Sequence, residues 1–334
     1  MKNLVLSMLA IASISVLSSC SSENDVIDNE VDNILKEEVK LSAGVGTITT
    51  KAVMENISTS MNVYFFCPKE GSTADWTTGT EYFGVISEEA NNPITLYKEK
   101  EHTNTATLYY NADATKLTHL AGCYTGDATV TDNLSTDASL SFDIDGTNDI
   151  MATNKLSKSK NDKFGTITFE HLLAQLYFVV EPADGIDADV VQNAFGKVKK
   201  IEVLSQPKSM KLSFKETTLL TTTETTTPYS NTFTIENTTG VDIKSDAAFG
   251  SAMILPQTDL GKVGTPINLK VYTENNTTGY TLTATINDGN VEMKASKKYT
   301  ITLKFSPNTI TVQGALGTWD GTGNDGGSGN IEDK

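Results

Sequence analysis

Short stretches in which apolar and polar residues alternate one by one recur along most of this chain, and they limit its possible folds more than any other feature. Alternation places every second side chain on the same face of an extended strand, and the many Thr and Tyr residues favour a pleated surface. Turn signals such as Asp145-Gly146 and Pro307-Asn308 separate the stretches. The pattern predicts an all-β fold made of β-sandwiches. The clearest stretches begin at Met61, Leu140, Leu269, Tyr280 and Tyr299.

Three segments depart from this alternation. A nearly continuous apolar run from Leu172 to Val180 predicts either a strand that is buried on both faces or the start of a second core. The segment from Asp187 to Phe195 is the one helix candidate, and it is short. Residues 216–240 are rich in Thr, Asn and Glu, which favours an exposed hairpin or a long loop.

The first 20 residues have the composition of an export signal. Lys2 is followed by an apolar run from Leu4 to Leu17, which is too short to span a bilayer comfortably. This predicts a secretory signal peptide over residues 1–19. The four residues that end at Cys20, Leu-Ser-Ser-Cys, also resemble the lipobox of bacterial lipoproteins. That resemblance implies that Cys20 carries acyl chains such as palmitate, which tether a protein outside the cytoplasm; the alternative is an ordinary signal peptide with a chance cysteine.

The length of the chain predicts two domains. Without its first 19 residues the 334-residue chain retains 315, which is more than one ordinary core holds. The Lys- and Ser-rich segment 155–163 is polar and has the character of a boundary. We therefore expect an acidic linker over 20–38, an N-terminal sandwich over 39–163, a C-terminal sandwich over 164–320 and a flexible tail over 321–334.

Charge and cysteine content exclude some functional classes. The formal charge of −16 would repel a phosphate backbone, so we expect no nucleic-acid partner. The chain has three cysteines, and the two besides Cys20 are too few for a disulfide framework. Cys67 and Cys123 either form one disulfide or remain buried free thiols.

No arrangement of reactive side chains points to catalysis, to a metal or to a cofactor. The three histidines lack metal-ligand spacing, and the sequence has no phosphate-binding glycine loop or nucleophile elbow. We expect His171 to be a packed, hydrogen-bonded residue at the start of a strand. The segment from Asp143 to Asp149 resembles a calcium loop only weakly because it lacks the terminal Glu, so we expect a turn. Trp76 and Trp319 are expected in core or rim positions. We therefore expect a protein that is not an enzyme.

A series of short motifs runs through the chain from Asn148 onward. They are Asn148-Asp149-Ile150-Met151-Ala152, Ile167 to Leu176, Ile254-Leu255-Pro256-Gln257, Lys298 to Leu303, Ile310-Thr311-Val312 and Gly317-Thr318-Trp319-Asp320-Gly321. In this order, behind a lipobox, they resemble the fimbrillin family of Bacteroidetes pilins over roughly residues 40–321. The resemblance implies two tandem β-sandwich domains of transthyretin-like, Greek-key type. It also implies a lipid-anchored, surface-exposed protein of the outer membrane that enters a pilus after proteolytic processing.

The same resemblance implies assembly by strand exchange. A surface protease cuts after a basic residue near the N-terminus and removes the first strand with its lipid, and a neighbouring subunit fills the opened groove with a donated strand. The alternating residues from Val39 to Val45 fit a removable strand. Lys51 stands where the family commonly has Arg, which predicts a cut between Lys51 and Ala52; the alternative is that Lys51 is only a turn residue.

The resemblance places the donor strand in the C-terminal segment. Ile310, Val312, Leu316 and Trp319 are the candidate donor side chains. The implied partners are other pilin subunits in a head-to-tail contact, the outer membrane through lipid on Cys20 before processing, and a host or bacterial surface ligand. A role as stalk, tip or anchor subunit stays open.

A second reading of the chain is a surface glycan-binding lipoprotein of a polysaccharide uptake system. Such a protein would share the export signal, the acidic linker and the tandem β-domains. It requires a cluster of exposed aromatic side chains on one face, and the sequence itself shows no such cluster.

Overall fold

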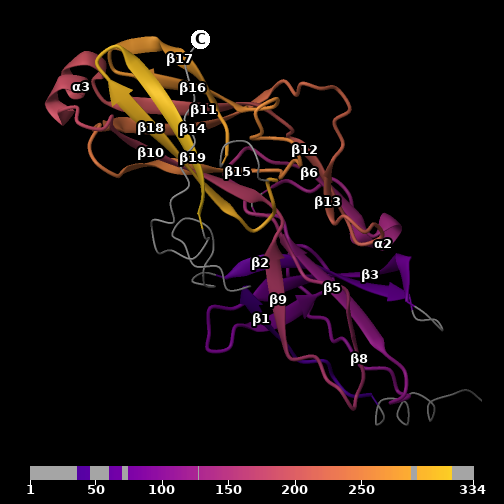
Figure 1. The fold of residues 1–334 in the computed structure, drawn as a ribbon. Coiled ribbons are helices and arrows are strands. Elements are labelled where there is room, and N and C mark those ends of the chain that lie inside the picture. Colours follow the sequence, from indigo (N-terminus) through magenta and orange to yellow (C-terminus); the bar gives the residue numbers. More distant parts are fainter. Residues whose placement is uncertain (1–35, 46–59, 70–73, 127, 287–291, 318–334) are drawn as a thin grey trace, which may run out of the picture. The chain divides into compact units, whose positions relative to one another are not determined.

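The computed structural model describes residues 36–45, 60–69, 74–126, 128–286 and 292–317, and Figure 1 shows their fold. Most regular structure in these residues is β-strand, so the all-β prediction is confirmed. The described residues also include two short helices, α2 (Leu134–Asp137) and α3 (Ala188–Phe195). Neither described helix is long and apolar enough to cross a membrane. The division into two tandem domains stays a prediction.

The largest sheet has eight strands and closes on itself. Its strands are β1 (Leu41–Val45), β2 (Met61–Lys69), β3 (Asp75–Ile86), β4 (Pro93–Tyr97), β5 (Thr118–Tyr124), β7 (Met151–Ala152), β8 (Leu156–Lys158) and β9 (Thr166–His171). Their order is β2-β3-β4-β1-β9-β7-β5-β8, and β2 also pairs with β5. That extra pairing joins all of these strands except β8 into a ring, so each ring strand has a neighbour on both sides.

The alternation of β2 divides its side chains between two hydrophobic cores. Met61, Val63 and Phe65 join a core that also contains Phe169 of β9, whereas Phe66 joins the other core. The rings of Phe65 and Phe169 meet edge to face, with centroids 6.2 Å apart. The strand predicted from Met61 is therefore confirmed, together with its buried face.

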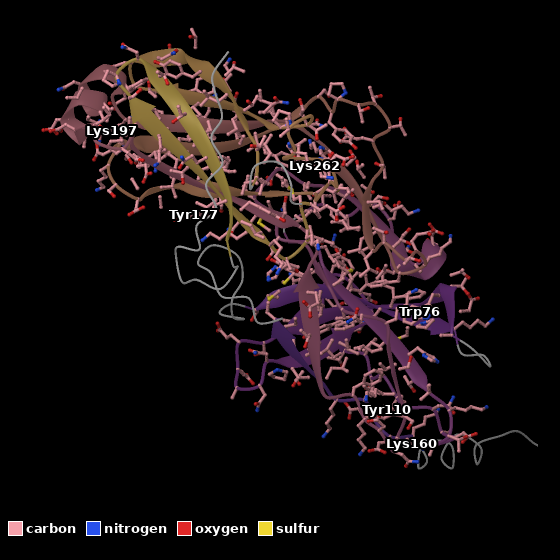
Figure 2. All side chains as sticks on the ribbon, in the orientation of Figure 1. Trp76, Tyr110, Lys160, Tyr177, Lys197 and Lys262 are labelled. Atoms are coloured by element: carbon pink, nitrogen blue, oxygen red, sulfur yellow. The ribbon has the colours of Figure 1, made fainter. Side chains whose placement is uncertain are left out.

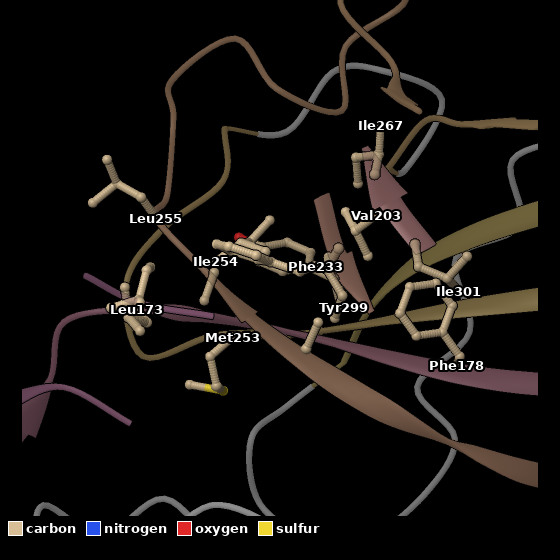
Figure 3. Close-up of a cluster of buried hydrophobic side chains, with 14 of the residues drawn as sticks. Leu173, Phe178, Val203, Phe233, Met253, Ile254, Leu255, Ile267, Tyr299 and Ile301 are labelled. Atoms are coloured by element: carbon tan, nitrogen blue, oxygen red, sulfur yellow. The ribbon is translucent and has the colours of Figure 1, made fainter. Parts of the chain in front are cut away.

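Two four-stranded sheets follow and bury one common core between them, as in a β-sandwich. Their strands are β10 (Ala174–Pro182), β11 (Val198–Gln206), β14 (Asn231–Val241), β15 (Ala247–Ile254), β16 (Ile267–Thr273), β17 (Asn276–Ala284), β18 (Lys298–Ser306) and β19 (Thr309–Gly317). The strand orders are β15-β10-β18-β19 and β14-β11-β16-β17. Figure 3 shows Phe178, Val203 and Ile301, from three different strands, gathered in this core.

The apolar run from Leu172 to Val180 forms a strand that is buried on both faces, as one of the two predicted alternatives requires. β10 lies between β15 and β18, so its backbone groups are paired on both sides. Phe178 faces the sandwich core, whereas Gln175 and Val179 are buried on the opposite face of the sheet. The second face of the run therefore holds Gln175 and Val179 in buried positions, where a half-exposed strand would have exposed polar residues.

The predicted short helix is confirmed as α3. The Asp187 carboxylate accepts a hydrogen bond of 2.8 Å from the backbone N–H of Asp189, which caps the first turn. Gly196, with φ of 67°, ends the helix in a conformation that favours glycine. The ring of Phe195 contacts Tyr280 of β17 and Phe305 of β18, so the helix packs against both sandwich sheets.

A three-stranded sheet connects segments that are distant in the sequence. It consists of β6 (Ser139–Asp143), β12 (Ser209–Ser213) and β13 (Leu220–Thr222), with β12 in the middle. β6 precedes the polar segment 155–163 and β12 follows it. Backbone pairing therefore links the chain on the two sides of the predicted domain boundary.

Residues 216–240 match the exposed hairpin or long loop that their composition favours only in part: β13 forms a hairpin with β12, and a second strand follows. Residues 231–240 all belong to β14, which pairs antiparallel with β11 at the edge of a sandwich sheet. Phe233 is buried in the core, whereas most other side chains of this strand are half-buried or exposed. An edge strand needs few apolar residues, so the Thr-rich composition concealed it.

The two described cysteines are free thiols rather than a disulfide. Cys67 lies on β2 and is half-buried, and Cys123 lies on the adjacent β5 and is fully buried. The register pairs Cys123 with Tyr64, so the two cysteines are not opposite each other.

Candidate strand-exchange site

β1 lies inside the large sheet rather than at its edge. It pairs antiparallel with β4, where Leu41 is opposite Ile94. On its other side it pairs parallel with β9, where Ala43 is opposite Ile167. The alternation from Val39 to Val45 predicted a strand here, and only the three-dimensional structure shows which two strands hold it.

Backbone hydrogen bonds extend this pairing toward the N-terminus. The N–H of Val39 donates to the carbonyl of Leu108 at 2.8 Å, and the N–H of Tyr110 donates to the carbonyl of Glu37 at 2.9 Å. The N–H of Ala43 donates to the carbonyl of Asn92 at 2.9 Å. Residues 37–45, which we call the first-strand segment, are therefore held by residues 108–110 and β4 on one side and by β9 on the other.

The side chains of the first-strand segment alternate between core and solvent. Val39, Leu41 and Ala43 are each at most 7% exposed, whereas Lys40 is exposed. The three buried side chains belong to the same core as Phe65 and Phe169. Burial of each Val or Leu side chain contributes about 1.5–3 kcal/mol.

Charged and aromatic contacts surround the start of this segment. Glu37 forms a salt bridge with Lys163, and this contact raises the pKa of the Lys163 ammonium. Next to it, the Tyr110 hydroxyl accepts a hydrogen bond of 2.7 Å from the backbone N–H of Phe164, and the two rings stack with centroids 5.7 Å apart. Burial raises the pKa of Tyr110.

The first-strand segment is an integral part of this sheet and of its core. Loss of residues 37–45 would leave backbone groups of β4 and β9 without partners and would open a groove lined by the side chains that now contact Val39, Leu41 and Ala43. Unpaired buried backbone groups and exposed apolar surface are both costly. A groove of this kind binds an extended strand of matching pattern.

The candidate donor segment is also a strand. β19 pairs antiparallel with β18 along its whole length and forms the edge of its sheet. Ile310 and Val312 are buried, and Leu316 packs against the same sandwich core. An edge strand is held on one side only, so it separates from its sheet at a lower cost than an interior strand.

Four of the predicted site residues fall outside the part of the chain that the structure describes. These are Cys20, Lys51, Ala52 and Trp319. Their roles in lipidation, cleavage and strand donation stay predictions.

The histidine predicted to be structural is packed and hydrogen-bonded. His171 is 1% exposed, and its Nδ1 lies 3.0 Å from Oδ1 of Asp149. It ends β9 rather than beginning a strand, which corrects the predicted position.

The acidic segment that weakly resembled a calcium loop adopts a turn. The Asp145 carboxylate accepts a hydrogen bond of 2.8 Å from the N–H of Thr147, and Gly146 has φ of 91°. In the described ranges no three His, Cys, Asp or Glu side chains gather closely enough to hold a metal ion.

Sequence reasoning missed the segments that pair with one side of the first-strand segment. β4 and residues 108–110 carry no strong strand signal, because β4 has only one buried side chain, Leu96. A signal did exist for β9, where Ile167, Phe169 and His171 alternate with Thr and Glu. That alternation shows a strand, but the parallel pairing with β1 depends on contacts between residues more than 120 positions apart.

Comparisons with known proteins give this chain a family and show which solved structures share its fold. A family model described as fimbrillin-like matches residues 50–319. The comparison with curated proteins found no match. Among solved structures, a candidate cell adhesion protein from Bacteroides uniformis is 15% identical with a TM-score of 0.55, over 85% of this chain and 98% of its own. A candidate cell adhesion protein from Bacteroides ovatus is 13% identical with a TM-score of 0.55, over 87% of this chain and 99% of its own. At such identities the likeness shows the fold alone.

Proposed function

The chain belongs to the fimbrillin-like family, and we propose that it is a structural or adhesive subunit of a cell-surface pilus, assembled by strand exchange. The proposal rests mainly on one observation, the position of β1 between β4 and β9 inside the large sheet. A removable interior strand leaves a groove that a second subunit can fill. In this role the protein is not an enzyme, and its partners are other subunits.

The proposed pathway begins at the outer membrane. Acyl chains on Cys20 hold the exported chain at the cell surface, because two or more chains make a stable anchor. A protease then cuts after Lys51 and releases the first-strand segment together with the lipid. The sequence contains no arginine, so the processing protease has to accept lysine.

The candidate donor has the same pattern as the strand that it would replace. Both segments read apolar, polar, apolar, polar, small, small, apolar, and both continue with Gly-Thr. Their burial also matches position by position, with the first, third and fifth residues buried in each. The corresponding buried or half-buried pairs are Val39 and Ile310, Leu41 and Val312, Ala43 and Gly314, and Val45 and Leu316.

This match supports a particular register for the exchange. A donor strand from a second copy would run parallel to β9 and place Val312 where Leu41 now lies. The small residue Gly314 would take the place of Ala43. Because each subunit offers a donor at one site and a groove at another, the contact is head-to-tail and extends into a filament.

Limited trypsin treatment of the chain that begins at Ser21 tests the proposal. The expected product is a ladder of polymers on SDS gels of unboiled samples, with Ala52 at the new N-terminus and filaments under the electron microscope. Strand-exchanged polymers survive the detergent because they dissociate slowly.

A Lys51→Gln variant is the matched control, because it keeps the fold and lacks the proposed cut site. It should stay monomeric under the same treatment. A wild-type product that is cut at Lys51 and stays monomeric at high concentration would contradict strand exchange between identical copies, and a ladder from Lys51→Gln would show that another cut starts assembly.

A further inference from the structure

A cavity of about 510 Å³ opens between three loops that the proposed assembly does not use. One wall comes from Ser205 of β11, where φ is 57° and the pairing with β14 is irregular. A second wall comes from residues 227–229, which precede β14. The third comes from the loop between β15 and β16, over residues 257–266, together with Asn268 of β16. A cavity of this size is in the range of small-ligand sites.

The lining combines flat apolar surfaces with several polar groups. Tyr229 supplies an aromatic ring, and Pro228, Pro266 and Leu260 supply further apolar surface. Besides the Tyr229 hydroxyl, the polar groups are two side-chain amides, one carboxylate and four hydroxyls, from Gln257, Asn268, Asp259, Ser205, Thr227, Thr258 and Thr265. An aromatic ring beside amides and hydroxyls matches a sugar, which has an apolar C–H face and a rim of hydroxyl groups.

Several of these polar groups have unused hydrogen-bonding capacity. Among the residues that the structure describes, the Tyr229 hydroxyl and the amides of Gln257 and Asn268 have no hydrogen-bond partner. Two amides offer both donors and acceptors, as vicinal hydroxyl groups require. These three groups are therefore free to bond a ligand.

The loop that carries most of the lining is fixed by its own backbone. The N–H of Leu260 donates to the carbonyl of Gln257 at 3.2 Å, and the N–H of Thr265 donates to the carbonyl of Lys262 at 3.0 Å. The N–H of Gly261 donates to the carbonyl of Thr265 at 2.8 Å. A site held in this way loses little conformational entropy when a ligand binds.

The local charge favours a neutral ligand. Lys262, labelled in Figure 2, forms a salt bridge of 2.9 Å with Asp259, so the one carboxylate of the lining is compensated. The chain as a whole carries −16, which disfavours anions.

A larger cavity of about 660 Å³ beside β6 and β12 is less suited to a sugar than the cavity beside Tyr229. It has no Tyr or Trp, and Asp143 already bonds Ser209 there, while Asp145 bonds Thr147.

We propose that the cavity beside Tyr229 binds a neutral saccharide. The sugar packs a C–H face on the Tyr229 ring and exchanges hydrogen bonds with Gln257 and Asn268. This site is independent of strand exchange, so it operates in the monomer as well as in a filament.

Saturation-transfer NMR with the uncut monomer tests the site. The probes are free galactose, N-acetylgalactosamine and fucose, which terminate animal glycans, and glucose, mannose and xylose, which build plant and microbial polysaccharides. At least one of the six sugars should receive saturation-transfer signal. A response among the first three indicates animal glycans as the source of the ligand, and a response among the last three indicates plant or microbial polysaccharides. Tyr229→Ala and Asn268→Ala should each weaken binding at least tenfold, which corresponds to about 1.4 kcal/mol.

Val190→Ala is the control, because Val190 of α3 is exposed, 47% accessible, and lies outside both this cavity and the strand-exchange site. It should change the affinity less than twofold. Unchanged thermal unfolding of all three variants establishes that they are folded. The proposal is overturned if none of the six sugars binds, or if binding survives both cavity substitutions.

Discussion

Leu41 is the residue at which the proposed removal of the first strand is most directly tested. In the uncut chain its side chain is buried in the same core as Phe65 and Phe169, and its backbone pairs with β4. Its neighbour Lys40 is exposed on the other face of the same segment. Substitution of Leu41 therefore changes the core packing of the segment, whereas substitution of Lys40 leaves both its core packing and its backbone pairing in place.

We predict that Leu41→Ala lowers the free energy of unfolding of the uncut chain by about 2–5 kcal/mol, because it leaves a cavity in the core. Lys40→Ala should change it by less than about 0.5 kcal/mol. Urea unfolding measures both. After cleavage at Lys51 and assembly, the Leu41→Ala and wild-type polymers should be equally stable, since the residue has been removed. A persistent difference would mean that the segment stays bound.

The thiols of Cys67 and Cys123 lie in the same eight-stranded sheet, and their titration is coupled to the stability of the fold. Burial raises the pKa of Cys67 to about 12, and burial also raises that of Cys123, with a smaller contribution from Glu81. Both folded-state values lie above the unfolded value of about 8.5. The stabilisation is therefore fully present below that pH and is lost as the pH rises toward the folded-state values.

We predict that thiol reagents label Cys67 and Cys123 slowly in the native chain at pH 8 and label both rapidly in denaturant. The urea midpoint should fall between about pH 9 and pH 11. Other groups titrate there too, so the control is a variant with Cys67→Ala and Cys123→Ala, whose midpoint should fall less. An equal fall in the two proteins would show that the thiols are not responsible.

At the scale of elements, the ring of strands explains why loss of β1 would open the sheet. Each ring strand has neighbours on both sides, and β1 closes the gap between β4 and β9. Its pairing with β9 is parallel, so a replacement has to enter in one direction only. Under the proposed exchange, the matching patterns of residues 39–45 and 310–316 predict the register of that replacement.

A peptide that copies residues 309–318 tests the register without altering the protein. Added to chain cut at Lys51, it should occupy the groove and suppress the polymer ladder, as should a peptide that copies residues 38–47. Val312→Asp in the first peptide should weaken suppression at least tenfold, because a charge would enter the core. Thr311→Asp, on the exposed face, should have little effect. Equal effects of the two substitutions would exclude the proposed register.

At the scale of the whole molecule, the proposed assembly gives each subunit one groove and one donor. A copy that keeps the donor but cannot open its groove should therefore end a growing filament. Lys51→Gln is such a copy, because β1 stays in place.

We predict that mixing uncut Lys51→Gln with wild-type chain before trypsin treatment shortens the filaments in proportion to its share. Electron microscopy measures the length distribution. A Lys51→Gln chain that also carries Val312→Asp is the control and should not shorten them. Filament lengths that are independent of the Lys51→Gln share would contradict head-to-tail exchange.

Much of the strand content was readable in the sequence, whereas the neighbours of β1 were not. The strand that contains Tyr299 alternates strictly and its burial follows residue by residue, whereas β2 alternates from Met61 to Phe65 and then also buries Phe66. β14 was missed because a single buried Phe233 is enough for an edge strand. β4 and residues 108–110, which pair with the first-strand segment, were missed as well. β4 buries only Leu96, and residues 108–110 are a short irregular stretch.

The sequence by itself determined the all-β class, the short helix at Asp187, the alternating first-strand segment and the similarity of that segment to residues 310–316. These features depend on side chains close together in the chain, because alternation and capping act over a few residues. Only the tertiary structure decided that β1 is an interior strand, that the cysteines are apart and that Tyr229 meets Gln257 and Asn268 at one cavity. Those features depend on pairing between distant segments, and local patterns do not specify which strands become neighbours.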